Sequence, residues 1–249
     1  MLKASIVGFY NLNESPWETT EKLAAWGYRA YEAGNFLLKG DVGDNLKKLA
    51  GYNFKVLSAS ADLDRLKNNT DEIAAEAKAL QVKYVCCYWS GPQNYGEAVK
   101  IAEILDTAGE KLRGEGLVLC YHNHDHEFKQ SFNGVKYFDI LMAAASPKNL
   151  SVNLDAGWAT VGGEDAPKLV GRLGDRIKLM HFKDFYDLND RSSFTALGTG
   201  KVDIQGIIRE ADKIGLEYIT VEQDSLRNLN CDDTALLSYL VLKESGLVE

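Results

Sequence analysis

The sequence predicts a single-domain α/β protein with the (β/α)8 architecture of a TIM barrel, spanning residues 1–249. Short β-type segments alternate with longer segments of helical periodicity, eight of each. Such alternation indicates a parallel sheet with helices outside it, and 249 residues is the size of one barrel. The rival fold, an open doubly wound sheet, would usually carry a glycine-rich GxGxxG turn after an early strand, and this motif is absent from the sequence.

Eight strands are expected, each where a short run of apolar, β-favouring residues lies between polar or turn-forming residues. In chain order they are Ala4–Phe9, Arg29–Glu32, Lys55–Ala59, Tyr84–Tyr88, Leu117–His122, Ser151–Asp155, Lys178–His181 and Ile219–Glu222.

Eight helices are expected between the strands, and several carry start or stop signals. Ser15 followed by Pro16 is typical of a first helical turn, Asp41 is a capping residue, and Thr70 is expected to cap the third helix. The fourth helix also repeats apolar residues at helical spacing. The predicted helices are Trp17–Gly27, Asp41–Gly51, Thr70–Leu80, Asn94–Arg113, Lys136–Ala145, Asp165–Leu173, Asp203–Ile214 and Leu229–Glu244.

The composition argues against several classes of protein. A formal net charge of −8 and an isoelectric point near 5.1 disfavour nucleic-acid binding, which depends on clustered Lys and Arg. No apolar run approaches the roughly 20 residues that a membrane-spanning helix needs. The four cysteines form no CxxC pair, so we expect reduced core thiols in a cytoplasmic protein.

Metal-binding and acid–base residues gather where four of the expected strands end. Asp155, His181 and Glu222 close the sixth, seventh and eighth strands, and the fifth strand leads into the histidine-rich segment 121–128. In a barrel of parallel strands these ends meet at one mouth, where active sites lie. Polar groups are costly to bury unpaired, so a shared cation would explain the pattern. Carboxylates with an imidazole suit Mn²⁺, Mg²⁺, Co²⁺ or Zn²⁺.

Several segments carry a resemblance to a known family. They are YHNHDHEF at 121–128, NLDAGW at 153–158, RIKLMHFKDF at 176–185, GTGKVD at 198–203 and TVEQD at 220–224. Over almost its whole length the chain resembles the xylose-isomerase-like TIM-barrel superfamily of sugar phosphate isomerases and epimerases. The most distinctive segment, YHNHDHEF, is similar to the branch that contains inosose dehydratase-like and keto-sugar-processing proteins.

The resemblance implies a TIM barrel with one divalent metal ion, Mn²⁺ being the favoured metal. Its ligands would be an acid on the fifth strand together with Asp155, His181 and Glu222. Sugar isomerases and epimerases of this kind are expected to act on a small-molecule sugar, with no nucleic acid and no membrane as partner. Homo-oligomerisation is left open.

The ligand from the fifth strand departs from the pattern of many relatives, which place a glutamate inside this strand. Here the strand ends in histidine, and the nearest glutamate, Glu127, lies further on. We expect Glu127 to reach back to the metal, with His124 as the alternative ligand. Strand alternation puts His122 and His124 on one face. His126 is expected to be a solvated loop residue.

Other residues near these strand ends are candidates for substrate binding. Trp158 could wall a sugar site or serve ordinary loop packing. Lys183 could bind a substrate oxygen or form a structural ion pair, and Glu32 could bind a sugar hydroxyl or an internal partner. The long polar stretch Tyr186–Thr199 is expected to form a loop over the mouth. The full set of substrate-binding candidates is His122, Trp158, Lys183, Glu32 and Asp224.

Together these features predict a divalent-metal-dependent isomerase or epimerase of a sugar or keto-sugar. The metal would bind a ketone oxygen and acidify the neighbouring carbon. A positioned acid–base group would remove the proton and leave an enediolate-like intermediate. Glu222 is expected to be one acid–base residue, and Glu127 or His124 the other.

Three other functions stay open from the sequence. Dehydration or lyase chemistry on a keto-sugar or inosose comes next, because a histidine opposite a carboxylate can protonate a leaving hydroxyl. A binding protein that kept the pocket but lost turnover is disfavoured by the complete Asp, His and Glu set. A phosphodiesterase of the endonuclease type is disfavoured by the acidic balance and by a total of four histidines.

Overall fold

Parallel strands curl into a closed barrel in the computed structural model, which describes residues 1–8, 14–227 and 229–249. The main sheet has the strand order β3-β2-β1-β13-β10-β9-β6-β5-β4. Its strands are β1 (Lys3–Val7), β2 (Ala30–Tyr31), β3 (Lys55–Val56), β4 (Ser58–Ser60), β5 (Tyr84–Cys87), β6 (Val118–His122), β9 (Leu150–Asp155), β10 (Ile177–Phe182) and β13 (Tyr218–Glu222).

The two ends of this strand order are pieces of one segment, which closes the barrel. Only Leu57 separates β3 from β4. β3 pairs with β2 and β4 pairs with β5, both in parallel, so residues 55–60 join the two edges of the sheet. The barrel thus has the predicted eight strand positions. The predicted strand Lys55–Ala59 is split into β3, which pairs with β2, and β4, which pairs with β5. The predicted end of the first strand, Phe9, lies outside the described residues.

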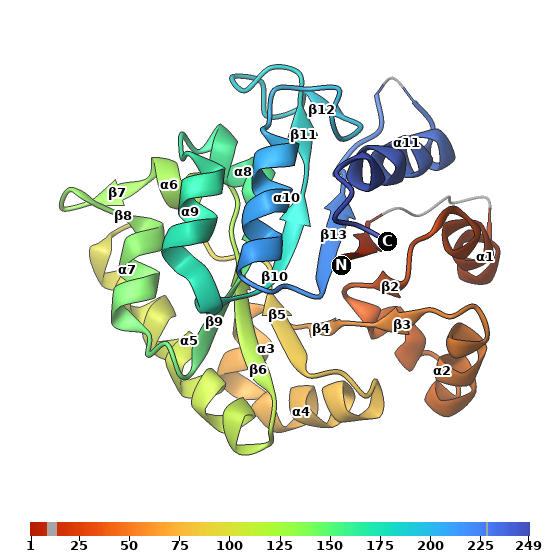
Figure 1. The fold of residues 1–249 in the computed structure, drawn as a ribbon. Helices are drawn as coiled ribbons and strands as arrows, with labels where there is room; N and C mark the ends of the chain where they lie inside the picture. The colour runs from red at the N-terminus through yellow and green to blue at the C-terminus, as the bar shows by residue number, and fades with distance from the viewer. Residues whose placement is uncertain (9–13, 228) are drawn as a thin grey trace.

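Helices pack around the outside of the barrel (Figure 1). All eight predicted helices are present with ends within two residues of the prediction, and a short additional helix, α3, precedes the third of them. The helices are α1 (Pro16–Trp26), α2 (Val42–Gly51), α3 (Leu63–Asn68), α4 (Thr70–Ala79), α5 (Tyr95–Gly114), α7 (Tyr137–Ala144), α9 (Ala166–Leu173), α10 (Ile204–Lys213) and α11 (Cys231–Glu244).

Side-chain caps explain most of the helix starts. Ser15 and Glu18 form a capping box at the start of α1, and Asp41 accepts a hydrogen bond from the third amide of α2. The predicted Thr70 cap is wrong, because Asn69 holds the cap position of α4 without a side-chain bond. Since α3 ends directly before this point, the Thr70 hydroxyl instead donates to the carbonyl of Leu66.

Short elements follow several strands and build the mouth of the barrel. After β2 comes η1 (Gly34–Leu38), after β6 comes α6 (His126–Lys129), and after β9 comes α8 (Ala156–Val161). A small antiparallel pair, β11 (Asp184–Phe185) with β12 (Phe194–Thr195), follows β10. The remaining short elements are β7 (Ser131–Phe132), β8 (Val135–Lys136) and η2 (Gly174–Arg176).

The interior of the barrel changes from apolar to charged along the strands. Nearer the N-terminal ends of the strands, the interior is filled by a separate apolar cluster. It is formed by Ala30, Leu57, Cys86, Cys120, Leu179 and Tyr218. Successive side chains of a strand alternate between its two faces, so the next inward-facing residue lies two positions further on. On four of these strands that residue is polar and buried: Glu32, His122, His181 and Thr220.

Two further expectations concern cysteines and membranes. Cys86, Cys87 and Cys120 are free and buried, as predicted, whereas Cys231 is only half-buried at the start of α11. None of the helices built from the described residues is both long enough and apolar enough to cross a bilayer.

Candidate metal and active site

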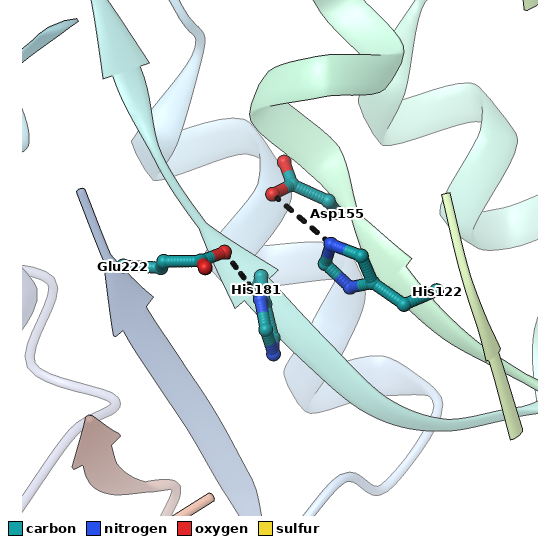
Figure 2. Close-up of side chains that lie close together, drawn as sticks. All are labelled: His122, Asp155, His181 and Glu222. Atoms are coloured by element: carbon teal, nitrogen blue, oxygen red, sulfur yellow. Dashed lines mark hydrogen bonds and ion pairs between the residues drawn. The ribbon is translucent and has the colours of Figure 1, made fainter. Parts of the chain in front are cut away.

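Four side chains converge at the C-terminal ends of neighbouring strands. His122 ends β6, Asp155 ends β9, His181 lies on β10 and Glu222 ends β13. One ligand atom from each lies within 4.8 Å of the corresponding atoms of the others. The side chains of the four residues point toward one another (Figure 2). The strand register explains the convergence, since His181 pairs directly with Asp155 across the sheet.

The imidazole of His181 is held by a buried carboxylate behind it. Its Nε2 donates to Oε1 of Glu32 at 2.8 Å, which turns Nδ1 toward Oε2 of Glu222 at 2.7 Å. Glu32 also accepts hydrogen bonds from Tyr88, Thr220 and the amide of Asn153. An imidazole anchored by a carboxylate on one nitrogen and free to coordinate through the other is the usual arrangement of a metal-binding histidine.

This network corrects the expectation that Glu32 binds a sugar hydroxyl. Glu32 is fully buried, and both of its carboxylate oxygens are engaged by groups of the barrel interior. The residue therefore orients His181 and is not exposed to a substrate. Of the two alternatives weighed from the sequence, the internal partner is the one observed.

Two buried polar atoms of the group lack a hydrogen bond in the part of the chain that the structure describes, although the Lys183 ammonium lies 3.3 Å from one of them, Oδ2 of Asp155. Oδ1 of Asp155 accepts from the backbone N–H of Trp158 at 2.7 Å and so caps α8. Its Oδ2 and the Nδ1 of His122 are buried and make no hydrogen bond within the described residues. Buried polar atoms are nearly always hydrogen-bonded in folded proteins. Two imidazoles and two carboxylates with such atoms fit a divalent metal ion.

Lys183 supplies the buried positive charge of the site. Its ammonium lies 3.3 Å from Asp155, 3.1 Å from Glu222 and 2.8 Å from Asp224, with the side chain 1% exposed. Of the two roles weighed for Lys183, the structure shows the ion pair, and Asp224, a substrate-binding candidate, is one of its partners. The ammonium also lies 5.1 Å from the ring centre of Trp158. Lys183 compensates three carboxylates, which would otherwise repel one another.

The charges of this group are strongly coupled. Burial lowers the pKa of His122 well below its ordinary value, and nearby His181 lowers it further, so the ring is neutral. Burial also lowers the pKa of His181, but Glu32 and Glu222 outweigh this and raise it to about 10. Burial raises the pKa of Asp155 to about 6.

For Glu222, burial raises the pKa, but Lys183 and His181 prevail and hold it well below its ordinary value. A metal ion bound here would displace the proton of His181, because imidazole coordinates in its neutral form.

The structure does not bring Glu127 to this group. Its Oε1 accepts from the hydroxyl of Tyr121 at 2.7 Å and its Oε2 from the backbone N–H of His124 at 2.8 Å. The side chain is fully buried with these partners, beside His124 and His126. The predicted metal ligand Glu127 is therefore replaced by His122 in the geometry, because α6 turns Glu127 away from the barrel axis.

His124 and His126 also differ from the expectation. His124 groups with His126 and Glu127 and is not one of the four converging residues, although its ring centre lies 5.1 Å from that of His122. His126 is not a solvated loop residue. Its ring is 15% exposed, packs on Trp89 and bonds to the carbonyl of Ser90.

Trp158 and the segment after β11 cover one side of the mouth. Trp158 is 3% exposed and packs against Phe185 and Phe194, while its indole N–H has no partner among the described residues. From the predicted loop, Arg191 lies over the Trp158 ring and pairs with Asp125 beyond β6 at 2.8 Å. The loop thus reaches across the mouth, as predicted.

A pocket of about 350 Å³ lies near the converging residues, but none of the four lines it. It is lined by residues of the second, third and fourth strand–helix connections, among them Asn35, Arg65, Tyr88 and Trp89. Tyr88 also contacts the ring of His122, with ring centres 5.2 Å apart. A larger cavity of about 610 Å³ lies at the opposite end of the barrel, near Lys55 and Lys178, far from this chemistry.

Strand alternation in the sequence indicates two roles that the prediction missed: His122 as one of the converging residues and Asn153 as a partner of Glu32. His122 is two residues beyond Cys120, which lies in the barrel interior, so alternation alone directs His122 inward toward the mouth. Asn153 is two residues before Asp155 on the same face and binds Glu32. The contact of Tyr88 with Glu32 joins different strands, and no local pattern indicates it.

Comparison with known proteins agrees with this architecture. Residues 20–234 match the family model described as xylose isomerase-like TIM barrel. A solved structure from Parabacteroides distasonis, described as a sugar phosphate isomerase/epimerase, superposes with a TM-score of 0.84 at 18% identity, covering 100% of this chain and 96% of that one. The IOLI protein with a bound zinc atom gives a TM-score of 0.74 at 14% identity, covering 98% and 96%. These likenesses show the fold.

Sequence relatives add inosose dehydratases. The one from Lacticaseibacillus casei is 29% identical over an alignment of 143 positions that covers 50% of this chain and 47% of the relative, so the chain spans about half the length of this relative. The one from Geobacillus kaustophilus is 26% identical over an alignment of 250 positions, gaps included, that covers 83% of this chain and 80% of the relative. With a family model covering most of its length, the chain belongs to the family of xylose isomerase-like TIM barrels.

Proposed function

We propose that the protein is a divalent-metal-dependent isomerase or epimerase that acts on a small keto-sugar by removing a proton next to its carbonyl group. The observation that supports this most is the convergence of His122, Asp155, His181 and Glu222 within 4.8 Å, with buried atoms on the first two that make no hydrogen bond. These four residues are the proposed metal ligands. Mn²⁺ is the proposed metal, with Zn²⁺, Mg²⁺ and Co²⁺ as alternatives.

The bound ion would supply a Lewis acid that polarises a ketone oxygen and acidifies the adjacent carbon. The chain itself supplies the group that moves the proton. Glu222 is 18% exposed, whereas the side chains of His122, Asp155 and His181 are at most 2% exposed. Its carboxylate is therefore the one of the four that a substrate in the mouth can reach, and we assign it the acid–base role.

Lys183 and Trp158 are the proposed contacts to substrate oxygens. The ammonium of Lys183 touches Glu222 and Asp155, so it lies beside the carbon that would lose its proton and can stabilise negative charge there. The unpartnered indole N–H of Trp158 is a donor for a hydroxyl group. Asp224 holds Lys183 in place. The pocket of about 350 Å³ that Tyr88 lines has the volume of a small-molecule site, although neither Lys183 nor Trp158 lines it.

Neither Glu127 nor His124 is kept as the second acid–base residue. Both carboxylate oxygens of Glu127 are already hydrogen-bonded, and the ligand atom of His124 groups with those of His126 and Glu127. A single carboxylate that moves a proton between neighbouring carbons is sufficient for isomerisation, because both positions can be reached on one face of the intermediate. Isomerisation is therefore favoured over epimerisation, which needs a second acid–base group on the opposite face.

Dehydration of a keto-polyol is the second candidate. It is favoured by the inosose dehydratase of Geobacillus kaustophilus, which aligns with 83% of this chain. The first step, removal of the proton beside the carbonyl, is the same in both reactions. The second step differs, because a proton returns to carbon in isomerisation and a hydroxyl group departs in dehydration.

Incubation of the Mn²⁺-loaded protein with keto-sugars and inososes in D₂O separates the two candidates. Isomerisation or epimerisation incorporates deuterium at carbon and conserves the mass of the sugar apart from that exchange. Dehydration yields a product lighter by one water, visible by mass spectrometry and by ultraviolet absorbance of the conjugated carbonyl. Finding no deuterium uptake and no product with any keto-sugar or inosose tested would contradict both.

A matched pair of variants ties the reaction to the site. Glu222→Gln is expected to abolish deuterium uptake, because the amide cannot accept the proton. Glu217→Gln changes an exposed glutamate on the preceding turn and is expected to leave uptake unchanged.

A further inference from the structure

A second group of potential metal ligands lies beside the first. His124, His126 and Glu127 each offer one ligand atom, and these atoms lie within 4.8 Å of one another. They come from the segment between β6 and the start of α6, not from separate strands. The Nδ1 atoms of both histidines are buried and have no hydrogen-bond partner within the described residues.

The tautomer of His126 is fixed by the backbone. Its Nε2 lies 2.9 Å from the carbonyl oxygen of Ser90, which can only accept, so Nε2 carries a hydrogen. In a neutral ring the lone pair is therefore on Nδ1. That atom faces Oε2 of Glu127 at 3.2 Å. Two acceptor atoms at this distance repel each other unless a proton or a metal cation lies between them.

Glu127 lacks the cationic partner that usually accompanies a buried carboxylate. Across residues 1–8, 14–227 and 229–249, its sole ion-pair contact is the His126 ring, and neither Lys nor Arg reaches it. Burial accordingly raises the pKa of Glu127. The neighbouring Asp125 differs, since Lys129 and Arg191 both pair with it. Burying an ionised carboxylate is costly unless a cation or a set of donors compensates its charge.

The surroundings hold these groups in place as they hold ligands of a metal. Tyr121 donates to Oε1 of Glu127, and its hydroxyl is bonded in turn to Ser90, which also bonds Tyr137. The ring of Trp89 packs on both histidines, with centres 5.1 and 4.5 Å away, and is 56% exposed. Hydrogen bonds thus hold the cluster on its inner side, and the exposed ring of Trp89 covers its outer side.

We propose that His124, His126 and Glu127 form a second divalent-cation site at the mouth of the barrel, next to the site of His122, Asp155, His181 and Glu222. Two imidazole nitrogens with one carboxylate oxygen are a common ligand set of zinc sites that keep a position open for water or substrate. Zn²⁺ is therefore the cation that this site suits best. The proposal does not depend on which reaction the protein catalyses.

Counting bound ions tests this proposal. The full-length protein is stripped with a chelator, dialysed against low-micromolar Zn²⁺ and analysed for zinc per chain. The wild type is expected to bind two ions. His126→Asn and Glu127→Gln are each expected to bind one, and Asp155→Asn is also expected to bind one, because it removes a ligand of the other site only. Glu110→Gln, at an exposed carboxylate on α5, should keep both ions.

The outcomes separate the two sites. One ion in the wild type, lost in Asp155→Asn and retained in His126→Asn, overturns the second site and leaves the first intact; the contact between His126 and Glu127 then holds a proton only. Two ions in both His126→Asn and Glu127→Gln also overturn it. Zero ions in the wild type contradict both sites. The ion that remains in His126→Asn verifies that the barrel is folded, so a misfolded Glu127→Gln does not weaken the test.

Discussion

The two histidine clusters at the mouth share their chemistry but differ in how the chain builds them. The strand cluster (His122, Asp155, His181 and Glu222) takes one residue from each of four strands that are consecutive around the barrel. The loop cluster (His124, His126 and Glu127) comes from one short stretch that follows β6. The protein has four histidines, and each cluster uses two of them.

This difference has consequences for rigidity and charge. The strand cluster is fixed by the hydrogen-bond ladder of the sheet, backed by Glu32, and supplied with a buried ammonium from Lys183. The loop cluster relies on side-chain contacts with Trp89 and Tyr121 and has a buried carboxylate with no such ammonium. We therefore expect the strand cluster to bind its ion more tightly, and a substitution in one cluster should spare the other.

The largest effect is expected from Asp155→Asn. Asparagine keeps the cap of α8 but is a much weaker ligand, so the ion of the strand cluster should be lost. Lewis-acid activation contributes several kcal/mol to such reactions, so turnover should fall by about 10⁴-fold. Deuterium exchange and zinc content measure the two effects. Asp165→Asn, a cap outside the site, is the control, and equal loss there would mean that the effect is structural.

Lys183→Met should destabilise the metal-free protein, because the strand cluster depends on this ammonium and the loop cluster does not. Removing a buried ammonium leaves Asp155, Glu222 and Asp224 uncompensated, so the free energy of unfolding of the metal-free protein should fall by about 3 to 5 kcal/mol. Added Mn²⁺ should restore part of this loss, because it binds the same carboxylates. Urea unfolding with and without Mn²⁺ measures both. A variant as stable as the wild type without metal contradicts the role given to Lys183.

Glu32→Gln should weaken the strand cluster without touching its ligands. The amide cannot fully replace the carboxylate that anchors His181, and loss of such an anchor typically lowers metal affinity by about 10- to 100-fold. The Kd for Mn²⁺, measured by titration, should rise by this factor while zinc binding to the loop cluster is unchanged. Glu76→Gln, at a half-buried carboxylate paired with Arg65, is the matched control. An unchanged Kd for Mn²⁺ would contradict the role of Glu32 as the anchor of His181.

The smallest effect is expected from Trp89→Ala. The indole packs on both rings of the loop cluster, and such aromatic contacts contribute about 0.5–1 kcal/mol. The Kd of the second ion should therefore rise about two- to fivefold, with the first ion unaffected. Isothermal titration with Zn²⁺ resolves the two. A larger change in Kd for the ion of the strand cluster than for that of the loop cluster would contradict the assignment of Trp89 to the loop cluster.

The strand cluster could be predicted from the sequence more fully than the loop cluster, for a physical reason. Parallel strands bring their C-terminal ends together whatever the loops do, so Asp155, His181 and Glu222 could be placed at one point from their positions alone. The fourth position was predicted as Glu127, and His122 lies there instead. The prediction of Glu127 followed the relatives that place a glutamate on this strand. Strand alternation, which directs His122 inward, would have given the observed residue.

Side-chain partners between distant strands were beyond prediction. Glu32 and His181 are 149 residues apart in the sequence, and their contact depends on the closure of the barrel. The conformation of the segment after β6 was equally inaccessible, since the single helical turn of α6 decides where Glu127 and His126 point. The pattern of barrel strands and outer helices was predictable because eight repeats of strand and helix reinforce one another. The Thr70 cap, the split at Leu57, helix α3 and the short elements at the loops departed from the prediction.

Anomalous diffraction from crystals of the Mn²⁺-loaded protein tests the central claim most directly. Our account predicts a strong peak at the manganese edge among His122, Asp155, His181 and Glu222, with one atom of each at about 2.0–2.3 Å, the range of metal–ligand bonds. A map without a peak at this position, whether or not an ion is bound at the loop cluster, would contradict it.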